Sequence, residues 1–212
     1  MSDNETRFSG MIGAEYELFK LAVPHHDELQ EQVGALVRQY AKLHSRREKI
    51  KVLDIGCGTG VTTKQILDAD PRVCVVALDN DKKMLTQAKA TLAHYGSRVT
   101  FREGAAACSI LQELHWDPYA AMEFDIIASA YTLHNFERSY RDSTLNGIAR
   151  ALYHGGLYIN ADNYAADDLL VHWKDLRDQV EAFAVFDTIG RSDLRREWTK
   201  HYLEDEVTKR TE

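Results

Sequence analysis

The chain has 212 residues, of which 44% are hydrophobic and 28% charged, and this composition is that of one folded domain with helical additions. Its formal net charge of −7 gives no overall field that attracts phosphate backbones, which argues against nucleic acid as a partner. The three cysteines form no CxxC pair and no apolar run reaches the roughly 20 residues of a membrane span, so we expect a cytoplasmic protein without a membrane anchor.

The first expected element is a helix over residues 14–41 that is interrupted at Pro24. Its second half carries apolar residues at helical spacing, which predicts a packing face. These residues are Leu29, Val33, Leu36, Val37 and Tyr40. We expect residues 1–45 to form an N-terminal helical cap.

The central part of the chain, residues 46–163, alternates short apolar runs with amphipathic segments. This alternation is typical of a parallel sheet wrapped by helices. The expected strands cover residues 51–55, 73–79, 98–102, 124–130 and 156–160. The predicted fold class is therefore α/β, a Rossmann-like doubly wound parallel sheet with helices on both faces.

Residues 164–212 are expected to be mainly helical and to serve as a lid or a dimer contact. One helix is predicted by a stripe of apolar residues, and a second follows Gly190. The stripe consists of Leu169, Trp173, Leu176, Val180 and Phe183. The only strand-like stretch in this part of the sequence is residues 183–189.

A glycine-rich turn follows the first expected strand in the sequence VLDIGCGTG, residues 52–60. Its glycines stand at alternate positions, whereas the dinucleotide-binding fingerprint requires a glycine at the sixth position, where this chain has Val61. Asp54 precedes the turn and favours a ligand with a positively charged portion over a diphosphate. Asp79, at the end of the second strand, has the position expected of a carboxylate that accepts ribose hydroxyls.

The sequence VLDIGCGTG, followed by VVALDNDKKMLTQA, resembles the class I S-adenosylmethionine-dependent methyltransferases. The resemblance continues through FREGAAA, EFDIIASAYTLHNF and ALYHGGLYINAD, and thus covers residues 50–162. Upstream, AEYELFKLAVPHHDELQEQV resembles the cap of small-molecule methyltransferases and of carboxy-S-adenosylmethionine synthase relatives. The family usually ends its sheet with two further strands. We expect these to be absent from this chain and the exposed sheet edge to favour a homodimer.

The resemblance implies S-adenosylmethionine as cofactor and S-adenosylhomocysteine as product. The implied cofactor-binding residues are Asp54, Gly56, Cys57, Gly58, Gly60, Asp79, Asn80, Met84, Gly104, Ala105, Ala106, Ser129 and Ala130. Asp54 and the glycines would hold the amino-acid end of the cofactor, and Asp79 would bind the ribose. Many family members carry an aspartate where this chain has Ala105, so the adenine must be recognised by other groups.

Four residues are candidates for the chemistry at the methyl group. Methyl transfer is an in-line displacement that depends on alignment, and a hydroxyl or acidic carbon acceptor also needs a base. His134 follows the fourth strand, and His25 and His26 follow Pro24, so each is a candidate for the base or for orienting the acceptor. The resemblance places Tyr131 beside the transferred methyl.

Two further interpretations of the sequence remain open. Asp162 and Asn163 resemble part of the metal site of magnesium-dependent O-methyltransferases, but Ser129 and Ala130 stand where the other carboxylate would be, so no metal is expected. The expected reaction is methyl transfer to an oxygen, nitrogen or carbon atom of a small molecule. The alternatives are an enzyme of the carboxy-S-adenosylmethionine type and a non-catalytic S-adenosylmethionine-binding subunit.

Overall fold

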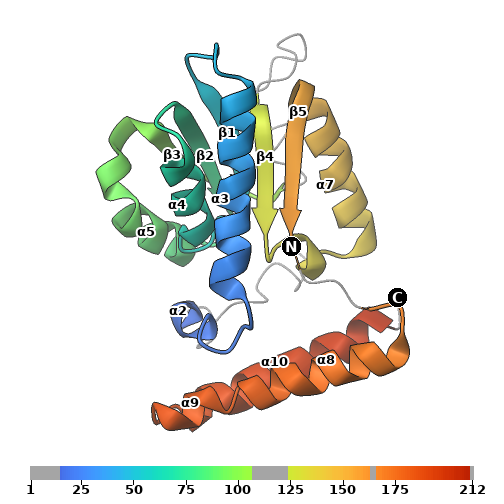
Figure 1. Cartoon of the computed structure of the whole chain (residues 1–212). Helices are drawn as coiled ribbons and strands as arrows, with labels where there is room; N and C mark the ends of the chain where they lie inside the picture. The colour runs from blue at the N-terminus through green and yellow to red at the C-terminus, as the bar shows by residue number, and fades with distance from the viewer. Residues whose placement is uncertain (1–14, 107–123, 163–165, 211–212) are drawn as a thin grey trace. The chain divides into compact units, whose positions relative to one another are not determined.

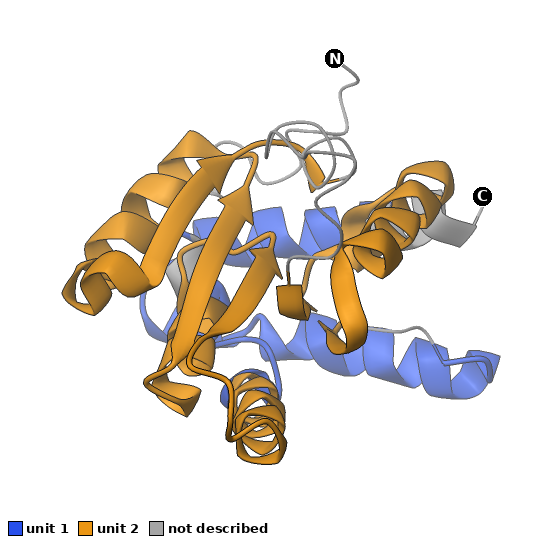
Figure 2. Ribbon diagram, turned by 90° about the horizontal axis from the view of Figure 1, so that it is seen from above, with its two compact units in different colours: residues 1–27, 164–212 blue, residues 28–163 orange. Residues whose placement is uncertain are grey.

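The structure is a computed structural model that describes residues 15–106, 124–162 and 166–210. The chain divides into two compact units, coloured separately in Figure 2. Unit 2 comprises residues 28–163, and unit 1 combines residues 1–27 with residues 164–212. The division predicted from the sequence, with boundaries after residues 45 and 163, stays a prediction.

Unit 2 is built on a five-stranded sheet in the order β3-β2-β1-β4-β5, with each neighbouring pair parallel. The strands are β1 (Ile50–Ile55), β2 (Val73–Asp79), β3 (Val99–Glu103), β4 (Phe124–Ala130) and β5 (Leu152–Ala161). Helices follow the strands on both faces (Figure 1), which confirms the predicted fold class. The sequence prediction started β5 four residues too late, at Gly156. The early part of β5 contains a register irregularity against β4.

The helices of unit 2 form two layers around the sheet. They are α3 (His26–Leu43, in unit 2 from Glu28 on), α4 (Val61–Ala69), α5 (Lys82–Thr91) and α7 (Arg138–Ala151), with the 3₁₀ turns η2 (Ala93–Arg98) and η4 (Leu133–Asn135). Residues of α3 and α4 form one core with Val52 of β1, whereas residues of α7 form another with Leu53. Alternate β1 side chains are thus buried on opposite faces, as expected for a parallel sheet covered on both sides.

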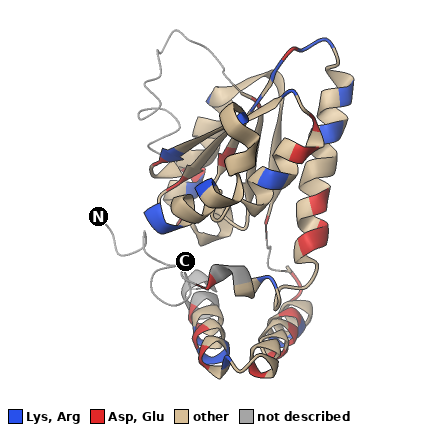
Figure 3. Cartoon of the chain, turned by 90° about the vertical axis from the view of Figure 1, so that its left-hand side faces the viewer, with Lys and Arg blue, Asp and Glu red and all other residues tan. Residues whose placement is uncertain are grey.

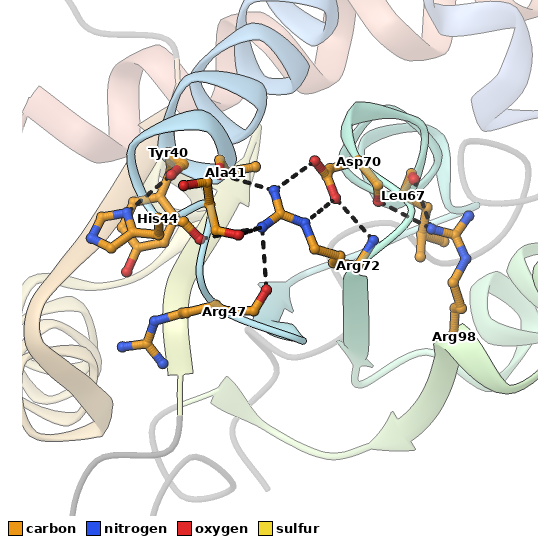
Figure 4. A network of polar contacts seen from close by, with 9 residues as sticks. Tyr40, Ala41, His44, Arg47, Leu67, Asp70, Arg72 and Arg98 are labelled. Carbon is orange, nitrogen blue, oxygen red and sulfur yellow. Dashed lines mark hydrogen bonds and ion pairs between the residues drawn. The ribbon is translucent and has the colours of Figure 1, made fainter.

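Arg72, at the start of β2, fixes the end of α3 to the sheet (Figure 4). Its guanidinium group donates hydrogen bonds to four backbone carbonyls and to the Asp70 carboxylate. The carbonyls belong to Ala41, His44, Ser45 and Arg47. Ala41 lies in the last turn of α3, where backbone carbonyls have no partner within the helix, so Arg72 caps this carbonyl. The other three carbonyls belong to the segment after α3, which Arg72 holds against the start of β2.

Unit 1 is helical in the residues that the structure describes. It contains α2 (Tyr16–Phe19), α8 (Leu169–Ala182), α9 (Val185–Thr188) and α10 (Ser192–Arg210). Phe183 and Trp198 are buried in its core, and the ring of Phe19 stacks on Trp198 at a centroid distance of 3.9 Å. The Gln179 amide also donates a 2.8 Å hydrogen bond to the Ala22 carbonyl. The two ends of the chain therefore share one core.

No strand was expected in this region, and the strand-like stretch 183–189 contains the helix α9, because Phe183 and Phe186 pack into the same helical core. The predicted packing stripe on α8 is buried at Leu176 and Phe183, but Leu169 and Trp173 are more than half exposed. Residues 166–210 contain no strand, so none follows β5 within that range.

Candidate functional site

The candidate site lies at the carboxyl ends of β1 and β4. The chain order of the strands reverses between these two neighbours, because β2 and β3 lie on one side of β1 and β4 and β5 on the other. Open parallel sheets bind ligands at such a switch point. The glycine turn follows β1 and leads directly into α4, while the segment 131–135 follows β4.

The glycine turn uses positive φ angles that side chains rarely adopt. Gly56 has φ +69° and Gly58 has φ +52°. A Cβ atom on Gly56 would lie 2.4 Å from Oγ1 of Thr132, so the turn after β4 packs directly on the turn after β1. A Cβ atom on Gly58 would meet no atom of the described residues within 4 Å. Open space therefore adjoins the turn at Gly58.

Asp54 is a fully buried carboxylate at the end of β1. Its Oδ2 accepts a 2.5 Å hydrogen bond from the Thr63 hydroxyl in the first turn of α4, whereas its buried Oδ1 has no hydrogen-bond partner among the described residues. The pKa of Asp54 is raised from 3.8 to about 7, mainly by burial, while the Thr63 hydrogen bond lowers it and the charge of Asp79 raises it further. A buried carboxylate with an unused oxygen suits a cationic ligand group.

Asp79 ends β2 and ties the glycine turn to the neighbouring loop. Its Oδ2 accepts from the Gly58 N–H at 2.8 Å, and its Oδ1 accepts from the Asp81 N–H at 2.9 Å. Burial raises its pKa, which the N–H groups of Asp81 and Gly58 lower. Each carboxylate oxygen can accept a second hydrogen bond, so the group is oriented and can still take hydroxyl donors.

The turn after β4 is held in a strained conformation. Tyr131 has φ +51°, a conformation that bulky residues rarely adopt and that is often found at functional sites. Its N–H donates to the Ala161 carbonyl at 2.9 Å, and its carbonyl accepts from the Asn135 amide at 3.2 Å. The Thr132 hydroxyl donates to the Ala130 carbonyl at 2.9 Å. These bonds fix the short turn η4, which carries His134.

His134 is bound by Asp162, the residue directly after β5. The Asp162 carboxylate accepts from the His134 backbone N–H at 2.9 Å and also bonds to its Nδ1. The Asp162 side chain is 1% exposed and that of His134 is 23% exposed. A carboxylate at Nδ1 assigns the proton to that atom and leaves Nε2 as an acceptor. This pair is arranged as a base held by an orienting carboxylate.

The remaining predicted residues of unit 2 differ in what their side chains contact. The Ser129 hydroxyl is buried and bonds to Asn160 and Tyr158 of β5, so it is engaged within the sheet. Cys57 is buried in the turn, and burial raises the pKa of its thiol. Gly104, Ala106 and Ala130 lie at or shortly after the carboxyl ends of β3 and β4, and Met84 is a buried residue in the first turn of α5. Asn80 is exposed and Ala105 partly exposed.

His25 and His26 belong to unit 1, whereas His134 belongs to unit 2. His25 is exposed and has φ +59°, and His26 is buried with its Nδ1 3.0 Å from Oδ1 of Asp27. Their predicted role at the acceptor stays a prediction.

Sequence reasoning missed two residues that organise the site. Thr63 was not singled out, although a hydroxyl in the first turn of the helix, nine residues after Asp54, is a detectable signal. Thr132 was also missed, because its contact with Gly56 joins two turns far apart in the chain. The sequence showed Asp162 only as part of an incomplete metal site, whereas its bonds to His134 place it at the histidine ring.

Comparison with known proteins gives one family match and several relatives. Residues 52–156 match the family described as "Methyltransferase domain". A carboxy-S-adenosyl-L-methionine synthase from Campylobacter lari is 22% identical over 72% of this chain and 59% of its own length. A ribosomal RNA small subunit methyltransferase H from Nautilia profundicola is 35% identical over 42% of this chain and 29% of its own length. A similar solved structure comes from Methanococcus maripaludis and is described as an S-adenosyl-L-methionine-dependent methyltransferase. It is 16% identical, has a TM-score of 0.55, and the match covers 98% of this chain and 87% of that one.

The family match over residues 52–156 and the shared fold confirm the resemblance to the S-adenosylmethionine-dependent methyltransferases found in the sequence. S-adenosylmethionine is the methyl donor of this family. The chain spans less than two thirds of the curated relatives described above, so its acceptor does not follow from theirs. Within the described residues, no group of three or more His, Cys, Asp or Glu side chains could hold a metal, and no helix is long and apolar enough to cross a membrane.

Proposed function

We propose that this protein binds S-adenosylmethionine at the switch point of unit 2 and transfers its methyl group to an oxygen or carbon atom of a small molecule. The observation that carries the proposal is the His134–Asp162 pair beside the glycine turn. A neutral amine acceptor needs no base, whereas a hydroxyl or an acidic carbon does. The pair therefore favours acceptors that lose a proton during the reaction.

The residues of the switch point fit the cofactor on their own chemistry. Asp54 offers an unused carboxylate oxygen for an ammonium group, and the open side of Gly58 allows a ligand to approach the backbone. The Asp79 carboxylate, oriented by two N–H groups, suits a ribose diol. When bound, the cofactor supplies a methyl group on a sulfonium, and the sulfur keeps the bonding electron pair when the methyl moves to the acceptor.

His134 is the proposed base. Its Nε2 would take the acceptor proton, and the Asp162 carboxylate, which already holds Nδ1–H, would stabilise the resulting imidazolium. Asp162 would act as a positioning residue, because it fixes both the backbone and the ring of His134. General base catalysis of this kind contributes about 10²- to 10⁴-fold in rate.

The test measures S-adenosylhomocysteine formed with two probe acceptors, a phenol and a 1,3-dicarbonyl compound. His134→Gln should lower kcat by ~100-fold or more with whichever probe reacts, and leave the affinity for S-adenosylhomocysteine unchanged. Asp162→Asn should lower kcat with a smaller effect on KM. The control is His154→Gln, since His154 is an exposed histidine on β5. Unchanged turnover in the His134 variant would remove His134 as the base.

The carboxy-S-adenosylmethionine type of enzyme has less support. That interpretation needs an arginine to bind an added carboxylate, and the candidates in the C-terminal segment are Arg191, Arg195 and Arg196. Arg191 pairs with Glu15 and Asp193. Arg195 pairs with Asp187, so two of the three guanidinium groups are already engaged. Tight cofactor binding without any turnover would instead favour the non-catalytic binding subunit.

A further inference from the structure

A groove of about 710 Å³ lies within unit 1, outside the methyltransferase domain. Val180 at the end of α8 and Asp187 of α9 line one side of it. The other lining residues come from α10, and they are Ser192, Arg195, Arg196, Thr199 and Lys200. Figure 3 colours the charged residues of these helices, which carry both signs.

The α10 residues of the groove form a single helical stripe. Counted from Ser192, they stand at positions i, i+3, i+4, i+7 and i+8, the spacing that usually gives a helix its apolar packing face. The apolar face of α10 lies elsewhere, with Leu194 and Trp198 buried in the core of unit 1. The helix therefore has two distinct faces, and the groove face carries hydroxyl and cationic groups.

The lining has more cationic than anionic side chains. Arg195 is paired with Asp187, which also accepts a 2.6 Å hydrogen bond from the Ser192 hydroxyl. Lys200 lies 3.8 Å from the Glu204 carboxylate, with both side chains about two-thirds exposed, so this contact is weak. Arg196 has no ion pair among the described residues. The groove thus keeps positive charge that its own carboxylate does not balance.

We propose that this groove binds the phosphate group of a small molecule. This binding is independent of the proposed methyl transfer. Arginine presents a planar fork of donors that matches phosphate oxygens, and lysine adds a point charge. Arg196 and Lys200 are adjacent on one helix face, and the hydroxyl of Thr199, which also lines the groove, is a further donor. Val180 provides an apolar wall for the body of a phosphate ester. The ligand is inorganic phosphate or a phosphate monoester.

The test is calorimetric titration of the full chain with phenyl phosphate and with inorganic phosphate as probes. Arg196→Gln and Lys200→Gln should each weaken binding by ~10-fold, as expected for loss of a charge-assisted hydrogen bond. Arg177→Gln is the matched control, since Arg177 is an exposed arginine of α8 that does not line the groove. Thr199→Val should weaken binding without changing the charge.

The two probes distinguish the two sources of phosphate. Tighter binding of phenyl phosphate identifies a monoester that uses the Val180 wall, and equal affinity identifies inorganic phosphate. Failure of both probes to bind below ~10 mM would overturn the proposal. An equal loss of affinity in the Arg177 variant would also overturn it, because it would show a general charge effect.

Discussion

Replacing Asp54 by asparagine should stabilise the ligand-free protein at alkaline pH. The pKa of Asp54 is raised from 3.8 to about 7, mainly by burial, so the folded protein binds more protons than the unfolded chain between these values. Stability is therefore lost as the pH rises from about 4 to about 7. The full shift corresponds to an upper limit of about 4 kcal/mol, at 1.36 kcal/mol per pKa unit.

Asparagine keeps an acceptor for the Thr63 hydroxyl and removes the buried charge, but its amide adds donors that the site does not satisfy. We therefore expect Asp54→Asn to raise the free energy of unfolding by about 1–3 kcal/mol at about pH 8, and by less at about pH 5. Urea unfolding followed by circular dichroism measures both values. If the free energies of unfolding of wild type and variant differed by the same amount at both pH values, ionisation of buried Asp54 would not be the cause. The variant should also lose affinity for S-adenosylmethionine.

Two other predictions concern the turn and the end of α3. Gly56→Ala should destabilise the protein by about 2–5 kcal/mol, because its Cβ would clash with Thr132 in addition to the strain of a positive φ. Gly58→Ala should cost only about 1–2 kcal/mol, since it meets no neighbour, and equal costs in denaturant unfolding would contradict the packing argument. Arg72→Lys should lower the melting temperature, because lysine cannot reach the four carbonyls and Asp70 together. The control Arg38→Lys, on the exposed side of α3, should leave the melting temperature unchanged. A thermal scan of both arginine variants decides this point.

The centre of the sheet was predictable because β1 and β4 are buried along almost their whole length and therefore appear as mainly apolar runs. The helical break at Pro24 and the start of β2 at Val73 were also predicted from local signals. The start of β5 was not, because the strand was expected to begin at Gly156 and begins four residues earlier, at Leu152. The early part of β5 pairs irregularly with β4, so its sequence does not show the regular alternation of buried and exposed residues that would mark a strand.

The candidate site was predictable where one short motif carries it and obscure where the fold brings distant residues together. Asp54 and the glycines stand within one motif. The structure shows a carboxylate bonded to Thr63 at Asp54 and positive φ angles at the glycines. The bond between His134 and Asp162 joins residues 28 positions apart, so sequence alone gave each a separate role. The same reason hid the packing of Thr132 on Gly56.

The most direct test of the central claim is the melting temperature of the chain with S-adenosylhomocysteine and, separately, with NAD. A ligand that binds only the folded state at ~100 times its dissociation constant adds roughly 2.7 kcal/mol of stability. We expect S-adenosylhomocysteine, and not NAD, to raise the melting temperature. The rise should be much smaller in the Asp54→Asn variant. Stabilisation by NAD, or by neither compound, would contradict the assignment of the glycine turn.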